Sequence, residues 1–173
     1  MPISAHEYRY VEWQNRATEF YISARMLYAS EHYRAAAYSA AITIELILKA
    51  TLCYWVKGFS PEAASHGLAK LARMVRNKVP ESTSLVVPEY FYFEQRYLSL
   101  SRYPKKGKGL AIPASMIEDL DTLFCAAIQL VPFQHNTQLK SALRGRKPAT
   151  LTALRRRNKK VRALRKFLAV PAP

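Results

Sequence analysis

The chain of 173 residues contains little glycine and few residues that bind metals. With only 5 glycines and almost no alternation of apolar and polar residues, the sequence speaks against a β-rich fold. Both cysteines, Cys53 and Cys125, lie in apolar segments, so we expect reduced, buried thiols. The 4 histidines and 2 cysteines include no pair at the spacing of metal ligands. We therefore expect neither a metal nor a cofactor.

The chain also lacks a long apolar run without charges. Glu45 and Lys49 interrupt the best candidate for a membrane span, so we expect no transmembrane segment. The N-terminus shows no basic segment followed by an apolar one, and we expect no signal peptide and a cytoplasmic protein. Hydrophobic residues make up 50% of the chain and aromatic residues 12%, which is typical of a chain with a packed core.

Acidic residues are absent after Asp121, and this absence divides the charge of +15 unevenly. Residues 1–137 carry 15 basic and 12 acidic residues, a net charge of +3, whereas residues 138–173 carry 12 basic residues and no acidic one. Positive charges at this density repel one another unless an anion binds, and neutralising phosphates releases counterions. The sequence therefore predicts nucleic acid as the partner of the C-terminal region. An anionic membrane surface and an acidic protein are the alternatives.

Apolar residues recur at three- and four-residue steps over residues 8–29, 33–56 and 113–132, and around residues 68–75, which predicts helices. An aromatic-rich segment at residues 88–104 adds a fifth helical candidate to the body. The sequence thus predicts an all-α fold in two parts. Residues 1–137 form an antiparallel up-and-down bundle of four to five helices, and residues 138–173 form a basic C-terminal extension. One amphipathic helical stripe of the extension consists of Leu151, Leu154, Val161, Leu164 and Leu168.

Glu45 and Lys49 stand one helical turn apart in the most hydrophobic segment, so they share a face and can pair. This pair faces water as an intrahelical salt bridge, is a buried structural bridge, or belongs to a site at the bundle mouth or a dimer groove, where it contacts a ligand. His66 is either a cap or packing residue of the following helix, or a general base or phosphate contact. It has no serine and acid partner of the triad type nearby in the sequence. The candidate catalytic residues are Glu45, His66 and Arg102.

Several segments resemble the HEPN domain in their order and rough spacing. They are Phe20-Tyr21-Ile22-Ser23-Ala24, Tyr33 with the alanines after it, Ile44-Glu45-Leu46-Ile47-Leu48-Lys49-Ala50, His66 with Leu68 and Leu71, and Ser101-Arg102-Tyr103-Pro104. The resemblance covers roughly residues 13–130. It implies an up-and-down helical bundle that often dimerises, so we expect a homodimer. It also implies a place among ribonuclease toxins and defence proteins, or among non-catalytic partners of small nucleotidyltransferase subunits.

The ribonucleases of this family carry an arginine followed, after four to six residues, by a histidine near the later helices. No histidine follows Arg96 or Arg102 at that distance, since the next one is His135. The one formal match, Arg25 to His32, spans the end of the first helix instead. The sequence therefore predicts a HEPN-like protein without an evident catalytic motif that binds nucleic acid, in a toxin–antitoxin or defence context. A metal-independent ribonuclease and a helical partner of a nucleotidyltransferase-type protein are the alternatives.

Basic residues cluster in a loop after Arg102 and in the C-terminal extension. Arginine gives bidentate phosphate contacts, Tyr103 can stack on a base, and the glycines at 107 and 109 let a backbone approach. A solvated turn is the alternative for the loop, which lacks the pattern of a Walker motif. The predicted nucleic-acid-binding residues are Arg102, Tyr103, Lys105, Lys106, Lys108, Arg144, Arg146, Lys147, Arg155, Arg156, Arg157, Lys159, Lys160 and Arg162. Their abundance does not separate RNA from DNA.

Overall fold

A computed structural model describes residues 5–80, 82, 85–88, 91, 112–132 and 137–169, with the side chains of 5–8 and 137 left aside. These ranges contain helices and no strand, which confirms the all-α prediction. The helices are α1 (Ala5–Ala29), α2 (Tyr33–Trp55), α3 (Leu68–Lys78), α5 (Met116–Ile128), α6 (Thr137–Leu143), α7 (Pro148–Arg155) and α8 (Val161–Phe167).

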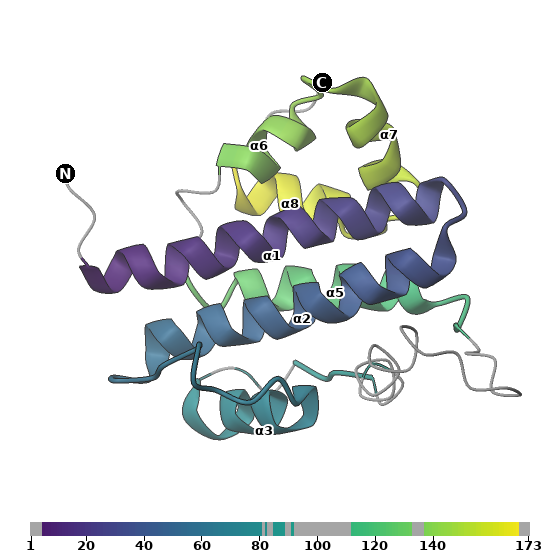
Figure 1. The fold of residues 1–173 in the computed structure, drawn as a ribbon. Coiled ribbons are helices and arrows are strands. Elements are labelled where there is room, and N and C mark those ends of the chain that lie inside the picture. Colours follow the sequence, from purple (N-terminus) through teal and green to yellow (C-terminus); the bar gives the residue numbers. More distant parts are fainter. Residues whose placement is uncertain are drawn as a thin grey trace, which may run out of the picture.

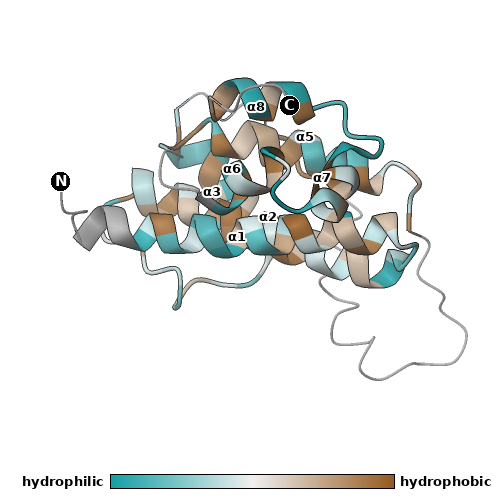
Figure 2. Ribbon diagram, turned by 90° about the horizontal axis from the view of Figure 1, so that it is seen from above, coloured by the Kyte–Doolittle hydropathy of each residue, from teal (hydrophilic) through white to brown (hydrophobic). Residues whose placement is uncertain are grey.

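The two longest helices, α1 and α2, run antiparallel and side by side, and α5 lies behind them (Figure 1). Helix α3 packs below α2, while α6 and α7 lie above α1. Seen from above, α8 lies on the same side of α1 as α5 (Figure 2). The C-terminal helices thus lie along α1, at the opposite side of the bundle from α3.

A tight turn joins α1 to α2. The backbone N–H of His32 donates to the carbonyl of Leu27 at 2.9 Å, and that of Glu31 donates to the carbonyl of Tyr28 at 3.1 Å. Glu31 takes a left-handed conformation with φ of 65°. This is the Schellman arrangement, in which a left-handed residue ends a helix and satisfies its last carbonyls. It turns the chain back on itself, so that α2 returns along α1.

Small residues bring α2 close to its neighbours. Ala36, Ala37 and Ala40 are fully buried and belong to the main core cluster. Helix α3 contributes Leu68 and Val75 to the same cluster, as the apolar spacing predicted. Of the described helices, only α2 is long and apolar enough to cross a membrane, and most of it is buried inside the protein. Its composition therefore fits the packing of a core helix.

Most leucines of the C-terminal region belong to the same core cluster as those of the bundle, namely Leu139, Leu143, Leu154, Leu164 and Leu168. The predicted amphipathic stripe is interrupted, because α7 ends at Arg155 and α8 begins at Val161. Arg157 between them has a φ of 55°, and the Asn158 side chain accepts the backbone N–H of Lys160 at 2.8 Å. A left-handed residue and a side-chain turn both break a helix. The boundary at residue 137 stays a prediction.

Candidate functional site

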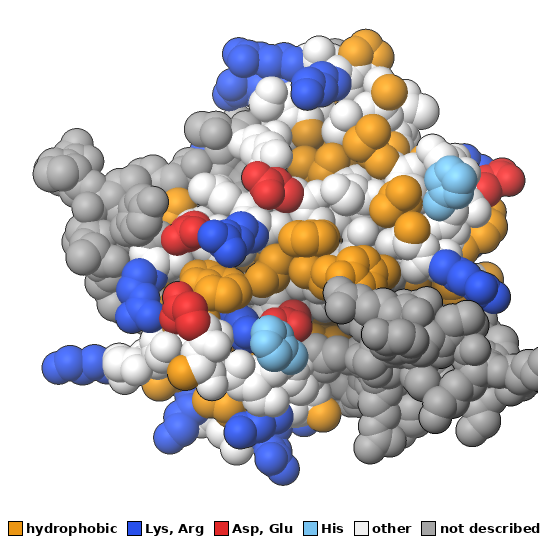
Figure 3. All heavy atoms as spheres, viewed as in Figure 1, with side chains coloured by type: hydrophobic (Ala, Val, Ile, Leu, Met, Phe, Trp, Pro, Cys, Tyr) orange, Lys and Arg blue, Asp and Glu red, His pale blue; other side chains and the backbone are white. Residues whose placement is uncertain are grey.

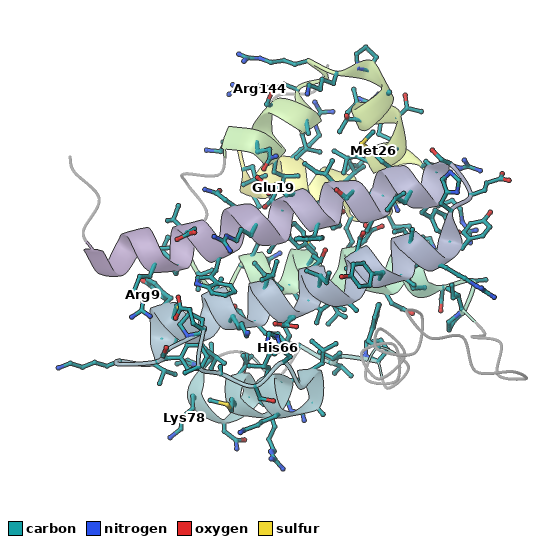
Figure 4. All side chains as sticks on the ribbon, in the orientation of Figure 1. Arg9, Glu19, Met26, His66, Lys78 and Arg144 are labelled. Carbon is teal, nitrogen blue, oxygen red and sulfur yellow. The ribbon has the colours of Figure 1, made fainter. Side chains whose placement is uncertain are left out.

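Glu45, Lys49 and His66 meet between α2 and the segment that precedes α3. The Lys49 ammonium lies 3.0 Å from Glu45 Oε1, and His66 Nδ1 lies 2.8 Å from the same oxygen. Figure 4 shows His66 in the space between α2 and α3. Two of the three predicted catalytic residues are therefore in contact, together with Lys49. The third, Arg102, lies outside the described residues, as do Tyr103, Lys105, Lys106 and Lys108.

Lys49 is buried rather than exposed. Its side chain is only 2% exposed, that of Glu45 14%, and the ammonium lies 5.3 Å from the centre of the Trp13 ring. The pair is therefore an intrahelical bridge that is buried rather than facing water, because α1 packs the Trp13 ring against it. A cation over an indole ring gains electrostatic attraction, which together with Glu45 offsets part of the cost of burial.

His66 receives its carboxylate partner from α2, 21 residues earlier in the chain. The residue that caps α3 is Gly67, so His66 is not the cap. When neutral, His66 donates its Nδ1–H to the Glu45 carboxylate, and its side chain is 79% exposed. Such a histidine is suited to accept a proton from a bound molecule. No serine is needed for that role.

Arg25 forms a second buried charge cluster, which joins α1 to α5 and α7. Its Nη1 donates to Asp121 Oδ2 at 3.1 Å, and its Nη2 donates to the carbonyls of Ala153 at 2.9 Å and Leu154 at 3.2 Å. The carbonyl of Arg156 also accepts from Nη2. Both charged side chains are 1% exposed. A buried cation at the C-terminal end of α7 interacts favourably with the helix dipole and donates hydrogen bonds to the last carbonyls of the helix. Arg25 is thus part of the scaffold, and its formal pairing with the exposed His32 forms no site.

Tyr21 and Asn158 complete this cluster. The Tyr21 hydroxyl donates to Asp121 at 2.8 Å and accepts from the Asn158 amide at 3.0 Å, while its ring stacks on Phe124 with centroids 4.1 Å apart. Burial raises the pKa of Asp121 to about 7, although Arg25 and Tyr21 favour its charged form. Burial and the neighbouring Asp121 also raise the pKa of Tyr21 well above its usual value. Sequence reasoning missed this cluster, because nothing in the sequence spacing connects its members.

The basic residues of the C-terminal region fall into two groups. The first group is bound within the protein. Arg157 and Lys159 both lie 3.1 Å from Glu118, Arg156 donates to the carbonyl of Ala29, and Arg165 donates to the carbonyl of Leu143 at 3.0 Å. These side chains attach α8 and the segment before it to the rest of the fold.

The second group is exposed and forms no ion pair within the described residues. Its members are Arg144, Arg146, Lys147, Arg155, Arg162 and Lys166. We call this set the C-terminal basic surface. Basic side chains gather over α6 and α7 in Figure 3, and Arg144 points away from the molecule in Figure 4. Lys160 is half-buried, and Lys166 is an exposed cation that the sequence prediction left out.

Helix α3 carries a second group of exposed basic side chains, which the sequence analysis did not single out. Its members are Lys70, Arg73, Arg76 and Lys78. Figure 3 shows basic side chains below the bundle, and Lys78 marks α3 in Figure 4. This group is smaller and lies on a single helix, whereas the C-terminal basic surface combines α7, α8 and the turn between α6 and α7.

Metal and thiol chemistry find no support in the ranges that the structure describes. No three histidine, cysteine or acidic side chains there are grouped so that they could hold a metal ion. Cys53 and Cys125 are both buried and free, as predicted. Burial raises the pKa of the Cys53 thiol to about 11, and it also raises that of Cys125. Both side chains are therefore protonated thiols at neutral pH.

Comparison with known protein families shows which family the chain belongs to. The model of the HEPN domain matches residues 10–123. The chain belongs to the HEPN domain family. No curated protein and no solved structure matches it. The match spans α2, α3 and most of α1 and α5, so the resemblance of the segments around Glu45 and His66 is confirmed at the level of the family. Helices α6 to α8, with the C-terminal basic surface, lie beyond the matched residues.

Proposed function

We propose that this HEPN-domain protein binds nucleic acid through the C-terminal basic surface. The observation that carries the proposal is that six exposed cations without an ion pair in the described residues lie on α7, α8 and the turn before α7. Arg25 of α1 binds the carbonyls at the end of α7, and Arg165 of α8 binds the carbonyl at the end of α6, so these elements are held in place. A charged surface held in place loses less conformational entropy on binding than a free tail. Phosphates that replace the counterions of these side chains give binding that weakens steeply with salt.

The test uses the full chain and measures affinity for labelled single-stranded RNA and duplex DNA in EDTA across a salt series. The variant carries Arg144→Gln, Arg146→Gln and Lys147→Gln, all in the exposed turn between α6 and α7. The slope of log affinity against log salt is negative, and we expect its magnitude to decrease by about 2 to 3, because each lost phosphate contact removes about 0.7 to 0.9 from it. Deleting residues 138–173 is a poorer test, because it removes core leucines and the carbonyl partners of Arg25.

The matched control removes the same charge from α3, through Lys70→Gln, Arg73→Gln and Arg76→Gln, which are also exposed. We expect this variant to bind nearly as the natural chain does. Loss of binding in the α3 variant with no change in the C-terminal variant would place the ligand on α3 and overturn the proposal. A natural chain that binds neither ligand would overturn it as well.

A metal-independent ribonuclease is the second candidate function, and the contact between Glu45 and His66 favours it. In this mechanism His66 removes the proton from a ribose 2′-hydroxyl while Glu45 stabilises the imidazolium that forms. A cation must also stabilise the charge on the phosphorus centre, and Arg102 is the sequence candidate for that role. The test is RNA cleavage in EDTA, which His66→Ala should abolish and His32→Ala, at an exposed histidine of the α1–α2 turn, should leave intact.

The family also supports an assembly as part of the proposal, either a homodimer or a complex with a nucleotidyltransferase-type protein in a toxin–antitoxin or defence pair. A band of hydrophobic side chains lies on the face formed by α1 and α2 in Figure 3, and Met26, on the side of α1 toward α7 in Figure 4, is 41% exposed. Exposed apolar patches mark contact surfaces between proteins. Sedimentation equilibrium over a wide range of concentrations tests the homodimer, and a monomer throughout would contradict it.

A further inference from the structure

The C-terminal segment meets the turn between α1 and α2 at one end of the bundle. Arg156 Nη1 donates to the carbonyl of Ala29, the last residue of α1, and Arg157 Nη1 donates to the Tyr28 hydroxyl at 3.0 Å. These two arginines keep part of their side chains in solvent, with exposures of 47% and 53%. Their guanidinium groups are therefore fixed at the turn and still accessible.

An exposed aromatic ring lies at the same turn. Tyr33 is the first residue of α2 and is 43% exposed. Its ring meets the ring of Tyr28 edge-on, with centroids 5.3 Å apart and planes at 66°. Because Tyr28 also accepts the hydrogen bond from Arg157, one continuous chain of contacts runs from that guanidinium to the Tyr33 ring.

Cations outnumber acids in the segments that meet at this turn. Arg34 and Arg155 are exposed and make no ion pair with any described residue, while Arg156 lies 3.9 Å from Glu31. Arg157 and Lys159 share the single carboxylate of Glu118. Five basic side chains thus face two acidic ones, which leaves the end of the bundle positive.

This end is continuous with the C-terminal basic surface through α7. Helix α7 has 8 residues and runs from the exposed turn at 144–147 to Arg155, which precedes the anchored Arg156. At a rise of about 1.5 Å per residue, the helix covers about 12 Å, the length of a few extended nucleotides. A strand bound along α7 would therefore reach Tyr33.

We infer that Tyr33, together with Arg156 and Arg157 at the same turn, is a stacking subsite for an unpaired nucleotide base. This inference rests on the proposed function, since it specifies which part of the bound nucleic acid contacts the protein next to the C-terminal basic surface. A base within a duplex is already stacked on both faces and cannot lie on a protein ring, whereas an unpaired base offers a free face. Guanidinium groups next to the ring neutralise the adjoining phosphate. The subsite thus favours single strands over duplexes.

The experiment compares a short single-stranded RNA with the blunt duplex of the same sequence, using fluorescence anisotropy and the full-length chain. Stacking on one aromatic side chain is worth about 1–3 kcal/mol by alanine substitution, so Tyr33→Ala should weaken single-strand binding at least about fivefold. Its affinity for the duplex should stay unchanged. Tyr33→Phe keeps the ring and should bind as the natural chain does.

Tyr38→Ala is the matched control, since Tyr38 lies on the same helix, is 41% exposed and forms no hydrogen bond or ring contact with the described part of the C-terminal segment. It should leave both affinities unchanged, and thermal unfolding confirms that each variant is folded. Single-strand binding that is equal in Tyr33→Ala and the natural chain would overturn the inference and leave the proposed function standing. If the natural chain shows no salt-dependent binding of nucleic acid, both the stacking subsite and the proposed function are overturned.

Discussion

Two buried cations of this protein, Arg25 and Lys49, have nearly the same exposure, but their carboxylate partners lie at very different separations along the chain. The side chain of Arg25 is 1% exposed and that of Lys49 is 2% exposed, and each pairs with one carboxylate. Lys49 finds its partner one helical turn away, whereas the partner of Arg25 lies 96 residues later in the chain. Burial alone therefore says little about what a charged side chain does. What matters is which helices its partners belong to, because a partner on the same helix stabilises that helix alone and partners on other helices join several.

The surroundings of the two carboxylates differ as well. Asp121 is as buried as Arg25 and has no route to solvent, while Glu45 is 14% exposed and also contacts His66. Removing one member of a fully buried pair leaves a charge without compensation, which costs several kcal/mol. Removing a buried lysine whose partner remains near solvent costs much less. Substitutions at the two sites should separate these cases.

The largest effect is expected for Arg25→Met. This change leaves Asp121 buried without its cation and removes the donor to three carbonyls at the end of α7, so unfolding should become easier by about 3–5 kcal/mol. Urea denaturation followed by circular dichroism measures the loss. A midpoint equal to that of the natural chain would show that the cluster contributes nothing to stability.

The pH dependence of this variant gives a sharper criterion. Burial already raises the pKa of Asp121 to about 7, and loss of the guanidinium should raise it further. A carboxyl whose pKa is raised by folding stabilises the protein at low pH, and this contribution is lost as the pH rises through the folded pKa. Arg25→Met should therefore lose more stability at pH 9 than at pH 6, and adding Asp121→Asn should remove the difference.

Local opening of the segment after α7 costs less free energy than unfolding and can be measured by limited proteolysis. Trypsin cleaves after arginine and lysine, and residues 155–160 contain five such sites. Because Arg25 holds the carbonyls of Leu154 and Arg156, its replacement should let this segment open and be cut faster. Lys49→Met should not change the rate of cleavage there, since Lys49 contacts α1 and not α7. Equal rates in all three proteins would contradict a role for Arg25 in holding the segment.

Lys49→Met should change the free energy of unfolding by less than about 1 kcal/mol. The methionine fills a similar volume beside Trp13, and avoiding the burial of an ammonium offsets the loss of the ion pair. The measurement is the same urea titration, with the exposed Lys57→Met as the control for a change at the surface. A loss as large as that of Arg25→Met would show that the two buried cations are equivalent after all.

The smallest effect is expected at Glu118, which attaches the segment before α8 to α5. Hydrogen bonds from Lys159 and Arg157 hold the pKa of this carboxyl below its usual value. A lowered pKa means that the contribution is present above about pH 4.3 and is lost as the pH falls through the folded value. The stability difference between the natural chain and Glu118→Gln should therefore shrink as the pH falls below about 4. A difference that persists in acid would mean that charge is not its cause.

The local features of this protein were predictable because they depend on spacing along one helix. The ends of α1 and α2 lie within a few residues of the predicted ones, and the contact of Glu45 with Lys49 follows from their separation of four. The contact of Glu45 with His66 was not predictable in this way, since the turn that brings His66 back to α2 has no fixed geometry in the sequence. The left-handed Arg157, which splits the C-terminal stripe, also gave no signal, because arginine has no preference for that conformation.

The sequence by itself determined the helical class of this protein, its family and the excess of positive charge after Asp121, since each depends on composition and order along the chain. Only the tertiary structure decided which cations face solvent and which are used within the fold. Arg25, Arg156 and Arg157 look alike in the sequence, yet one is buried and the other two fix the last helices to the α1–α2 turn. The reason is physical: a guanidinium is used by whichever carbonyls and carboxylates the packing of distant helices brings within its reach.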